Sequence, residues 1–158
     1  MTLQFLGDVE ENEIPKLCQL IREIAESGDY KIGELHLSGI GCFPNDFAPR
    51  VVYVAVESEG LDALKSLQNY IANKLAYFGF EVDSRSWKAH ITLARIREGS
   101  DKCNFPLSKA DHHAGPPDKG GRGVLRVTSV DLMQSVLSSK GPAYSVVEKF
   151  IIAGENNK

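Results

Sequence analysis

The segment HITLAR, residues 90–95, places a histidine and a threonine in a run that otherwise resembles an apolar strand. Side chains alternate between the two faces of a strand, so His90 and Thr92 should share one face while Ile91 leaves the other. An imidazole serves as acid or base near neutral pH, and a hydroxyl can stabilise a developing oxyanion. On spacing alone, a buried polar pair satisfied by backbone groups is the better interpretation. A catalytic interpretation therefore needs a second set of polar side chains that faces His90 and Thr92.

The elements that would position this segment are strands mixed with two helices. Helices are predicted at 14–28 and 61–78, where apolar residues recur at helical spacing and a glycine ends each run. Strands are predicted at 2–6, 34–40, 50–57 and 90–96, with a strand or strand pair at 124–137. Residues 145–153 fit either a strand or a helix, and 97–123 are loop-like. This order favours an α+β fold over a strict βαβ alternation. No linker interrupts it, so 1–158 is expected to be one domain.

The overall composition restricts the classes of function. The formal net charge is −3, whereas proteins that grip extended duplex are usually basic, so we expect no extended duplex binding. The three cysteines, Cys18, Cys42 and Cys103, have no ligand-like spacing, which predicts reduced thiols in a cytoplasmic protein, with no disulfide framework and no zinc site. No run approaches the length of a spanning helix, so no membrane partner is expected, and the first residues do not resemble a signal peptide.

The start of the chain hints at an internal repeat. TLQFLG and TLARIR both begin with a threonine at the head of a predicted strand, Thr2 and Thr92. The second threonine is preceded by His-Ile, the first only by Met1. A partner for His90 should therefore stand just before Met1.

These motifs resemble the two-histidine phosphoesterase superfamily, and within it the RNA 2′,3′-cyclic phosphodiesterases once called 2′-5′ RNA ligases. That family carries a pair of His-x-Thr motifs in two pseudo-symmetric lobes. HITLAR matches the second motif, and TLQFLGDV (2–9) matches the family run that comes after the first histidine. Other stretches agree with the family as well. Between the two motifs these are GIGCFP (39–44), RVVYVAV (50–56) and GFEVDSRSWKAH (79–90), and after the second motif they are LMQSVL (132–137) and GPAY (141–144).

The resemblance implies a bilobal, pseudo-symmetric α+β domain with antiparallel sheets facing a central groove and helices outside. It also implies hydrolysis of RNA 2′,3′-cyclic phosphate ends to 2′-phosphomonoesters. Such a reaction needs a base to activate water and an acid to protonate the departing 3′ oxygen, and two histidines suffice for both. No cofactor and no metal is expected. The implied partner is an RNA 3′ end or nucleotide carrying a cyclic phosphate.

By the same resemblance, His90 is the proton acceptor, and Thr92 and Thr2 hold phosphate oxygens. Arg95 and Phe5 match family positions that meet the terminal nucleoside, where guanidinium and aromatic planes stack on a base. Strict alternation, however, places Arg95 and Phe5 on the faces opposite the threonines, so a twist or bulge is needed. A surface strand charge is the competing interpretation of Arg95.

The match departs from the family at its first motif, where Met1 takes the middle position and the histidine would lie upstream. The leading strand and helix of family members are absent from residues 1–158 as well. A shortened version, a start drawn too late and a variant that has lost half its catalytic pair are the three explanations. We expect residues 1–158 alone to be poorly active. The rival function is a non-catalytic relative that binds a nucleotide or RNA end.

Other chemically reactive side chains have simpler interpretations. His36 is expected to be an exposed strand histidine, although it is one candidate to replace a lost catalytic histidine. Asp111-His112-His113 lies in a Gly/Pro-rich segment and is expected to be a solvated loop rather than a metal site. Tyr144 is expected to be a packed aromatic beside a turn, and Cys42 and Cys103 to be unreactive thiols.

Overall fold

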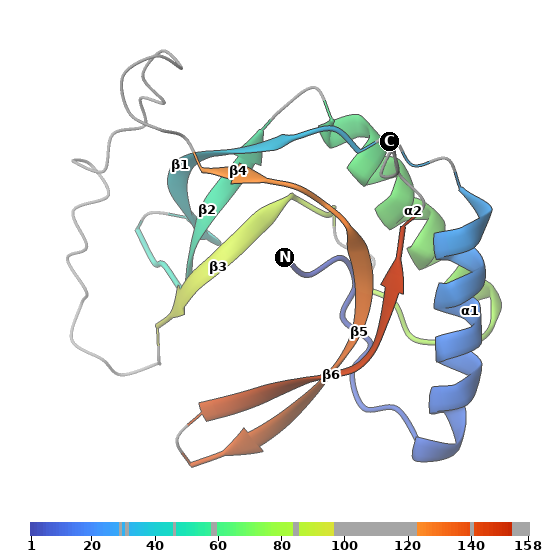
Figure 1. Cartoon of the computed structure of the whole chain (residues 1–158). Coiled ribbons are helices and arrows are strands. Elements are labelled where there is room, and N and C mark those ends of the chain that lie inside the picture. Colours follow the sequence, from blue (N-terminus) through green and yellow to red (C-terminus); the bar gives the residue numbers. More distant parts are fainter. Residues whose placement is uncertain are drawn as a thin grey trace. The chain divides into compact units, whose positions relative to one another are not determined.

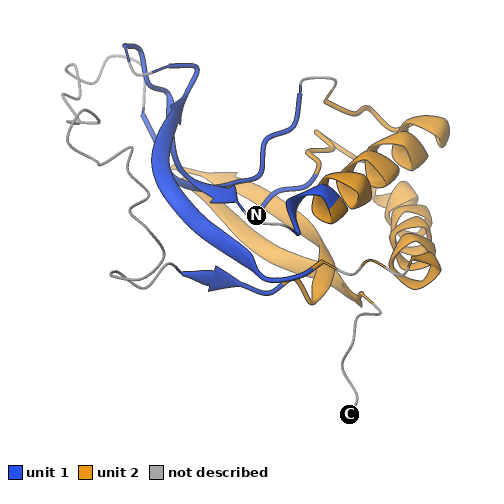
Figure 2. Cartoon of the chain, turned by 90° about the horizontal axis from the view of Figure 1, so that it is seen from above, with its two compact units in different colours: residues 1–3, 33–62, 86–126 blue, residues 4–32, 63–85, 127–158 orange. Residues whose placement is uncertain are grey.

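The structure is a computed structural model that describes residues 1–28, 30, 32–45, 47–57, 60–83, 86–96, 123–139 and 141–152. Its elements are η1 (Glu11–Glu13), α1 (Ile14–Ser27), β1 (Leu35–Phe43), β2 (Val51–Glu57), α2 (Leu61–Tyr77), β3 (His90–Arg95), β4 (Val124–Leu125), β5 (Ser129–Ser138) and β6 (Gly141–Ile151). Figure 1 labels the helices and strands. The chain divides into two compact units: residues 1–3, 33–62 and 86–126 form unit 1, and 4–32, 63–85 and 127–158 form unit 2 (Figure 2).

Unit 1 contains a four-stranded antiparallel sheet with the order β3-β2-β1-β4. The run VVYVAVE, rich in β-branched residues, forms β2, one of the two inner strands, which suits such residues because their side chains pack on a pleated surface. One face of this sheet is buried and carries Leu35, Cys42, Val52 and Val56. The other face, which we call the site face, carries Val51, Tyr53 and Ala55 of β2, and these are half-buried.

Two irregularities interrupt the pairing in unit 1. On β3, Thr92 pairs with Tyr53 and Ala94 with Val52, so Leu93 is an extra residue. On β1, Leu37 pairs with Val56 and Ile40 with Val54, so this strand also holds one extra residue. Each is a β-bulge, which re-aims the side chains that come after it.

Unit 2 combines the two helices with the β5–β6 hairpin. Pro15 lies in the first turn of α1, where its missing N–H costs no helical hydrogen bond. One side of α1 buries apolar residues that include Leu17, Ile21 and Ile24, and the helix packs against β5 and β6. Val130, Leu132, Phe150 and Ile152 supply the buried side chains of the hairpin region.

A polar group on α1 is tied to β6 within unit 2. Arg22 forms an ion pair with Glu148, and the Cys18 thiol is hydrogen-bonded to the same carboxylate. The Cys18 thiol, followed by the Arg22 guanidinium, holds the pKa of the Glu148 carboxyl below its usual value. Burial raises the pKa of the Cys18 thiol.

The predicted strand at 2–6 is wrong. Residues 2–6 form no strand, and Gly7 comes next with φ 69°. Only three apolar residues carried the pattern, and a run so short does not specify a pairing partner without tertiary context. Phe5 is accordingly exposed rather than packed on a sheet.

The remaining elements agree with expectation. Both helices are confirmed, as are the strands predicted at 34–40, 50–57 and 90–96, and the α+β class is confirmed. Residues 124–137 contain two strands, β4 and most of β5, which belong to different sheets, and residues 145–151 are strand rather than helix. Most of the loop predicted at 97–123 lies outside the described residues. The single-domain boundary and the central groove stay predictions.

Candidate active site

The half-buried His90 opens β3, and its ring orientation is set by one short hydrogen bond. Its Nδ1 lies 2.7 Å from the carbonyl oxygen of Lys88. A carbonyl oxygen only accepts, so Nδ1 carries the proton and donates it. In the neutral ring, the lone pair therefore resides on Nε2. His90 is thus held in the tautomer that can accept a proton at Nε2.

Two aromatic rings of unit 1 contact the imidazole. Phe43 at the end of β1 and Tyr53 of β2 stack with centroids 4.3 Å apart and planes 25° apart. The His90 ring meets Phe43 edge-on at 5.2 Å and Tyr53 at 5.4 Å. The ammonium of Lys88 lies 6.0 Å from the Phe43 ring centroid. His90 therefore stands against a pair of aromatic planes on the site face.

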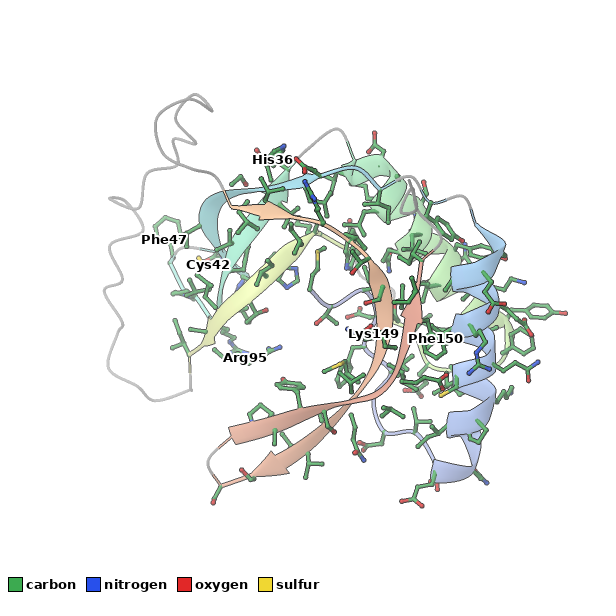
Figure 3. The ribbon with its side chains drawn as sticks, viewed as in Figure 1. His36, Cys42, Phe47, Arg95, Lys149 and Phe150 are labelled. Carbon is green, nitrogen blue, oxygen red and sulfur yellow. The ribbon has the colours of Figure 1, made fainter. Side chains whose placement is uncertain are left out.

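The bulge at Leu93 resolves the alternation problem for Arg95. Arg95 pairs with Val51, Thr92 with Tyr53 and His90 with Ala55. Directly paired residues share a face, and Val51, Tyr53 and Ala55 alternate along β2. His90, Thr92 and Arg95 therefore all lie on the site face, and Thr92 and Arg95 are exposed there. Figure 3 shows Arg95 at the far end of β3.

Thr2 belongs to the same unit as His90, although it is not in a strand. The Nε1–H of Trp87 donates a hydrogen bond of 3.1 Å to the Thr2 carbonyl oxygen. Trp87 lies in the segment that leads into β3, so this bond ties the start of the chain to the entry of that strand. The Thr2 side chain is exposed. Its phosphate-binding role stays a prediction.

Phe5 is described with unit 2, where its ring is 71% exposed. The structure gives it no ring contact among the described residues. Its role beside a terminal nucleoside stays a prediction.

His36 lies on β1 and is half-buried rather than exposed. It pairs with Glu57, which places it on the site face, but β2 separates it from β3 (Figure 3). The side chains of His36 and His90 thus lie on the same face of one sheet, whereas an in-line acid and base must approach phosphorus from opposite sides. This placement argues against His36 as the partner of His90.

The other sequence candidates belong to unit 2, to the buried face of the unit 1 sheet or to residues outside the described ranges. Tyr144 is 63% exposed on β6, so the expectation of a packed aromatic is wrong. Its side chain leaves the hairpin face opposite to buried Leu132 and Phe150, which explains the exposure. Cys18 and Cys42 are buried and form no disulfide bond. Cys103 and Asp111-His112-His113 lie outside the described residues.

Within the described ranges, no three His, Cys, Asp or Glu side chains are grouped so that they could hold a metal ion. Among the same residues, no helix has the length and apolar character that crossing a membrane requires.

Sequence reasoning did not assign roles to Phe43, Tyr53, Gly41 or Trp87. Their contacts depend on which strands pair and in which register, and local pattern does not reveal that. The available signal was the agreement of GIGCFP, RVVYVAV and GFEVDSRSWKAH with the family pattern.

Comparison with known proteins identifies the family of this chain. The family model described as the AKAP7 2′5′ RNA ligase-like domain matches residues 1–150. An RNA 2′,3′-cyclic phosphodiesterase of Archaeoglobus fulgidus is 30% identical over 95% of this chain and 77% of its own length. Proteins of the same name from Aquifex aeolicus and Thermus thermophilus are each 32% identical, over 98% and 100% of this chain and 78% and 74% of their own lengths.

Solved structures share the fold. A crystal structure of a Thermus thermophilus protein has a TM-score of 0.67 at 27% identity, covering 98% of this chain and 78% of that one. Escherichia coli LigT, solved in complex with 3′-AMP, also has a TM-score of 0.67 at 22% identity, covering 96% of this chain and 75% of that one.

Proposed function

The chain belongs to the 2′-5′ RNA ligase-like family, and on that premise we propose that it hydrolyses RNA ends carrying a 2′,3′-cyclic phosphate. The product is a 2′-phosphomonoester with a free 3′ hydroxyl. The observation that carries the proposal is the hydrogen bond from His90 Nδ1 to the Lys88 carbonyl. That bond leaves Nε2 as the proton acceptor on a face that also presents Thr92 and Arg95.

The proposed reaction is in-line attack of water on phosphorus. His90 Nε2 takes a proton from the attacking water, a bond forms between phosphorus and the water oxygen, and the bond to the 3′ oxygen breaks. The departing 3′ oxygen takes a proton from an acid on the opposite side, and in the family pattern this acid is the histidine of the first motif. The Thr92 hydroxyl, with that of Thr2, donates hydrogen bonds to the non-bridging oxygens, where negative charge grows.

Substrate binding in this proposal is local. Arg95 stacks on or pairs with the terminal nucleotide from the same face as Thr92, while Phe5 is the second candidate contact. A protein with net charge −3 is suited to an RNA end rather than a long duplex. Proton transfer between histidines and substrate requires no metal, so the proposal is metal-independent. We place the reaction in the cytoplasm, where the Cys18 and Cys42 thiols remain reduced.

The test is turnover of a short RNA with a 2′,3′-cyclic phosphate in the presence of EDTA, with the phosphate position of the product determined by NMR. The assay uses the natural full-length chain, including whatever residues its reading frame adds before Met1. His90→Ala should lower kcat by about 10²- to 10⁴-fold, the usual range for a lost general base, without changing the thermal unfolding midpoint.

The matched control is His36→Ala, a histidine of the same face on another strand, which should keep near-normal turnover. Near-normal turnover of His90→Ala would exclude His90 as the base. Binding of the RNA end with no turnover in EDTA or in Mg²⁺ would support the non-catalytic rival instead.

A further inference from the structure

We propose that Tyr53 is a positioning residue, which lies across Gly41 and fixes the plane of the His90 imidazole so that Nε2 stays aimed at the substrate. The inference rests on the proposed function for its kinetic consequence. Its structural part, the orientation of His90, can be tested without turnover.

One hydrogen bond does not by itself hold an imidazole. The bond from Nδ1 to the Lys88 oxygen fixes one nitrogen, but the ring can still tilt about that bond. Catalytic groups lose rate when they deviate by about 1 Å or less, so tilt matters. A second contact is needed to restrict it.

Tyr53 provides that contact from the centre of the sheet. Its ring meets His90 at 5.4 Å with the planes 66° apart, an edge-to-face arrangement that aromatic pairs favour. Phe43 meets His90 at 5.2 Å and stacks on Tyr53 at 4.3 Å, so the three rings restrict one another. Tyr53 is the member that links the other two and is also the direct cross-strand partner of Thr92.

Gly41 explains why the Tyr53 ring takes this position. Gly41 pairs with Tyr53 on the β1 side, and a Cβ built on Gly41 would lie 2.7 Å from both Cζ and Oη of the ring. Such a distance is shorter than real Cβ contacts allow. A glycine in a strand commonly marks a close approach of this kind. Because position 41 has no side chain, the Tyr53 ring can lie over β1, and its neighbour Thr92 is exposed.

The first experiment compares kcat and KM for Tyr53→Leu and Tyr53→Phe in the RNA assay above. Tyr53→Leu removes the aromatic plane and should lower kcat by about 10- to 100-fold with little change in KM, because the base is misaligned while the binding groups remain. Tyr53→Phe keeps the ring and should restore most of kcat. Tyr77→Leu, which removes an exposed tyrosine at the end of α2, is the control and should behave as wild type.

The second experiment perturbs the same ring from the other side. Gly41→Ala should displace the Tyr53 ring and lower kcat in the wild-type background. In the Tyr53→Leu background the clash is gone, so Gly41→Ala should cause no further loss. Additive losses would mean that Gly41 acts through something other than Tyr53, and would overturn the proposal.

The third experiment does not depend on turnover. Residual dipolar couplings of the His90 ring C–H bonds in chain 1–158 report the orientation of the imidazole plane and how far it is averaged. Wild type and Tyr53→Phe should give couplings that fit one ring orientation, and Tyr53→Leu should give couplings reduced by averaging over several orientations. If Tyr53→Leu keeps the wild-type couplings, the positioning role is wrong whatever the kinetics. If the couplings change as expected but no variant or wild-type chain hydrolyses the RNA, the positioning stands and the proposed function fails.

Discussion

At the scale of single residues, the Lys88 carbonyl decides how His90 can act. A hydroxyl partner could donate or accept and would let the tautomer exchange, whereas a carbonyl accepts in every state. The 2.7 Å bond therefore keeps Nδ1 protonated through the catalytic cycle and leaves all proton exchange to Nε2. Under the proposed reaction, the neutral ring accepts the proton of water at Nε2 without losing this bond.

Glu148 gives a residue-scale prediction for stability. Its carboxylate accepts from Cys18 and pairs with Arg22, and these partners hold its pKa below the usual value in the folded chain. A carboxyl with a depressed folded pKa stabilises the fold above its unfolded pKa, and that stabilisation disappears as pH falls through the folded pKa. The free energy of unfolding should therefore fall on acidification below about pH 4.5, the ordinary glutamate value.

Glu148→Gln should flatten this acid dependence, because the amide cannot be protonated in that range. Urea unfolding between pH 6 and pH 3 measures it, with Glu26→Gln on α1 as the control. Equal acid sensitivity of wild type and Glu148→Gln would exclude Glu148 as a source of the dependence.

At the scale of elements, the bulge on β3 gives a prediction about binding. It brings Arg95 to the face of Thr92 and His90. A guanidinium that stacks on a base contributes about 1–2 kcal/mol, so Arg95→Ala should weaken binding of adenosine 2′-monophosphate by about five- to thirtyfold. Titration calorimetry at fixed salt measures the change. Arg126→Ala removes an arginine of the same unit that is hydrogen-bonded to Glu34, and it should leave the affinity unchanged.

The elements also show how far sequence reasoning extends here. Helical spacing correctly predicted α1 and α2, and alternation correctly placed His90 and Thr92 on one face. Alternation alone could not place Arg95, because a single extra residue reverses the facing of everything after it. It also could not reveal the contacts of Gly41 and Tyr53, which arise only from pairing between strands far apart in sequence. The prediction of a strand at 2–6 was wrong for a related reason, because these residues have a strand-like pattern but pair with no other strand among the described residues.

At the scale of the whole molecule, residues 1–158 should hydrolyse the cyclic phosphate poorly compared with a chain that includes a histidine before Met1. The leaving 3′ oxygen would depart without a proton donor, a loss of about 10²- to 10⁴-fold. Binding should suffer less, because Thr92 and Arg95 are present in both forms. Parallel measurements of kcat and Kd on the two forms separate these effects. Full activity of residues 1–158 would mean that another acid within these residues protonates the 3′ oxygen, and would contradict the argument against His36.

The same comparison should reveal a difference in solution mass. Among the described residues, β5 and β6 pair only with each other, and the hairpin exposes several large apolar side chains: Met133, Leu137, Tyr144, Val146 and Ile151. An unpaired strand edge beside exposed apolar side chains favours association. Light scattering should find residues 1–158 associating at lower concentration than the extended form. Two monodisperse monomers of equal behaviour would contradict this expectation.

The extra residue in β3 also has a consequence for how related chains should be aligned. In a regular strand, side chains at even and odd residue numbers lie on opposite faces. His90 and Thr92 have even numbers and Arg95 an odd one, yet all three lie on the site face, because the extra residue Leu93 shifts the alternation by one. In a relative with one residue fewer between threonine and arginine, the strand would have no bulge, and the arginine would still lie on the same face as the histidine and the threonine. The two spacings therefore place the three side chains equivalently. An alignment of such chains needs a one-residue gap here, because without the gap the arginines would be paired with the wrong residues.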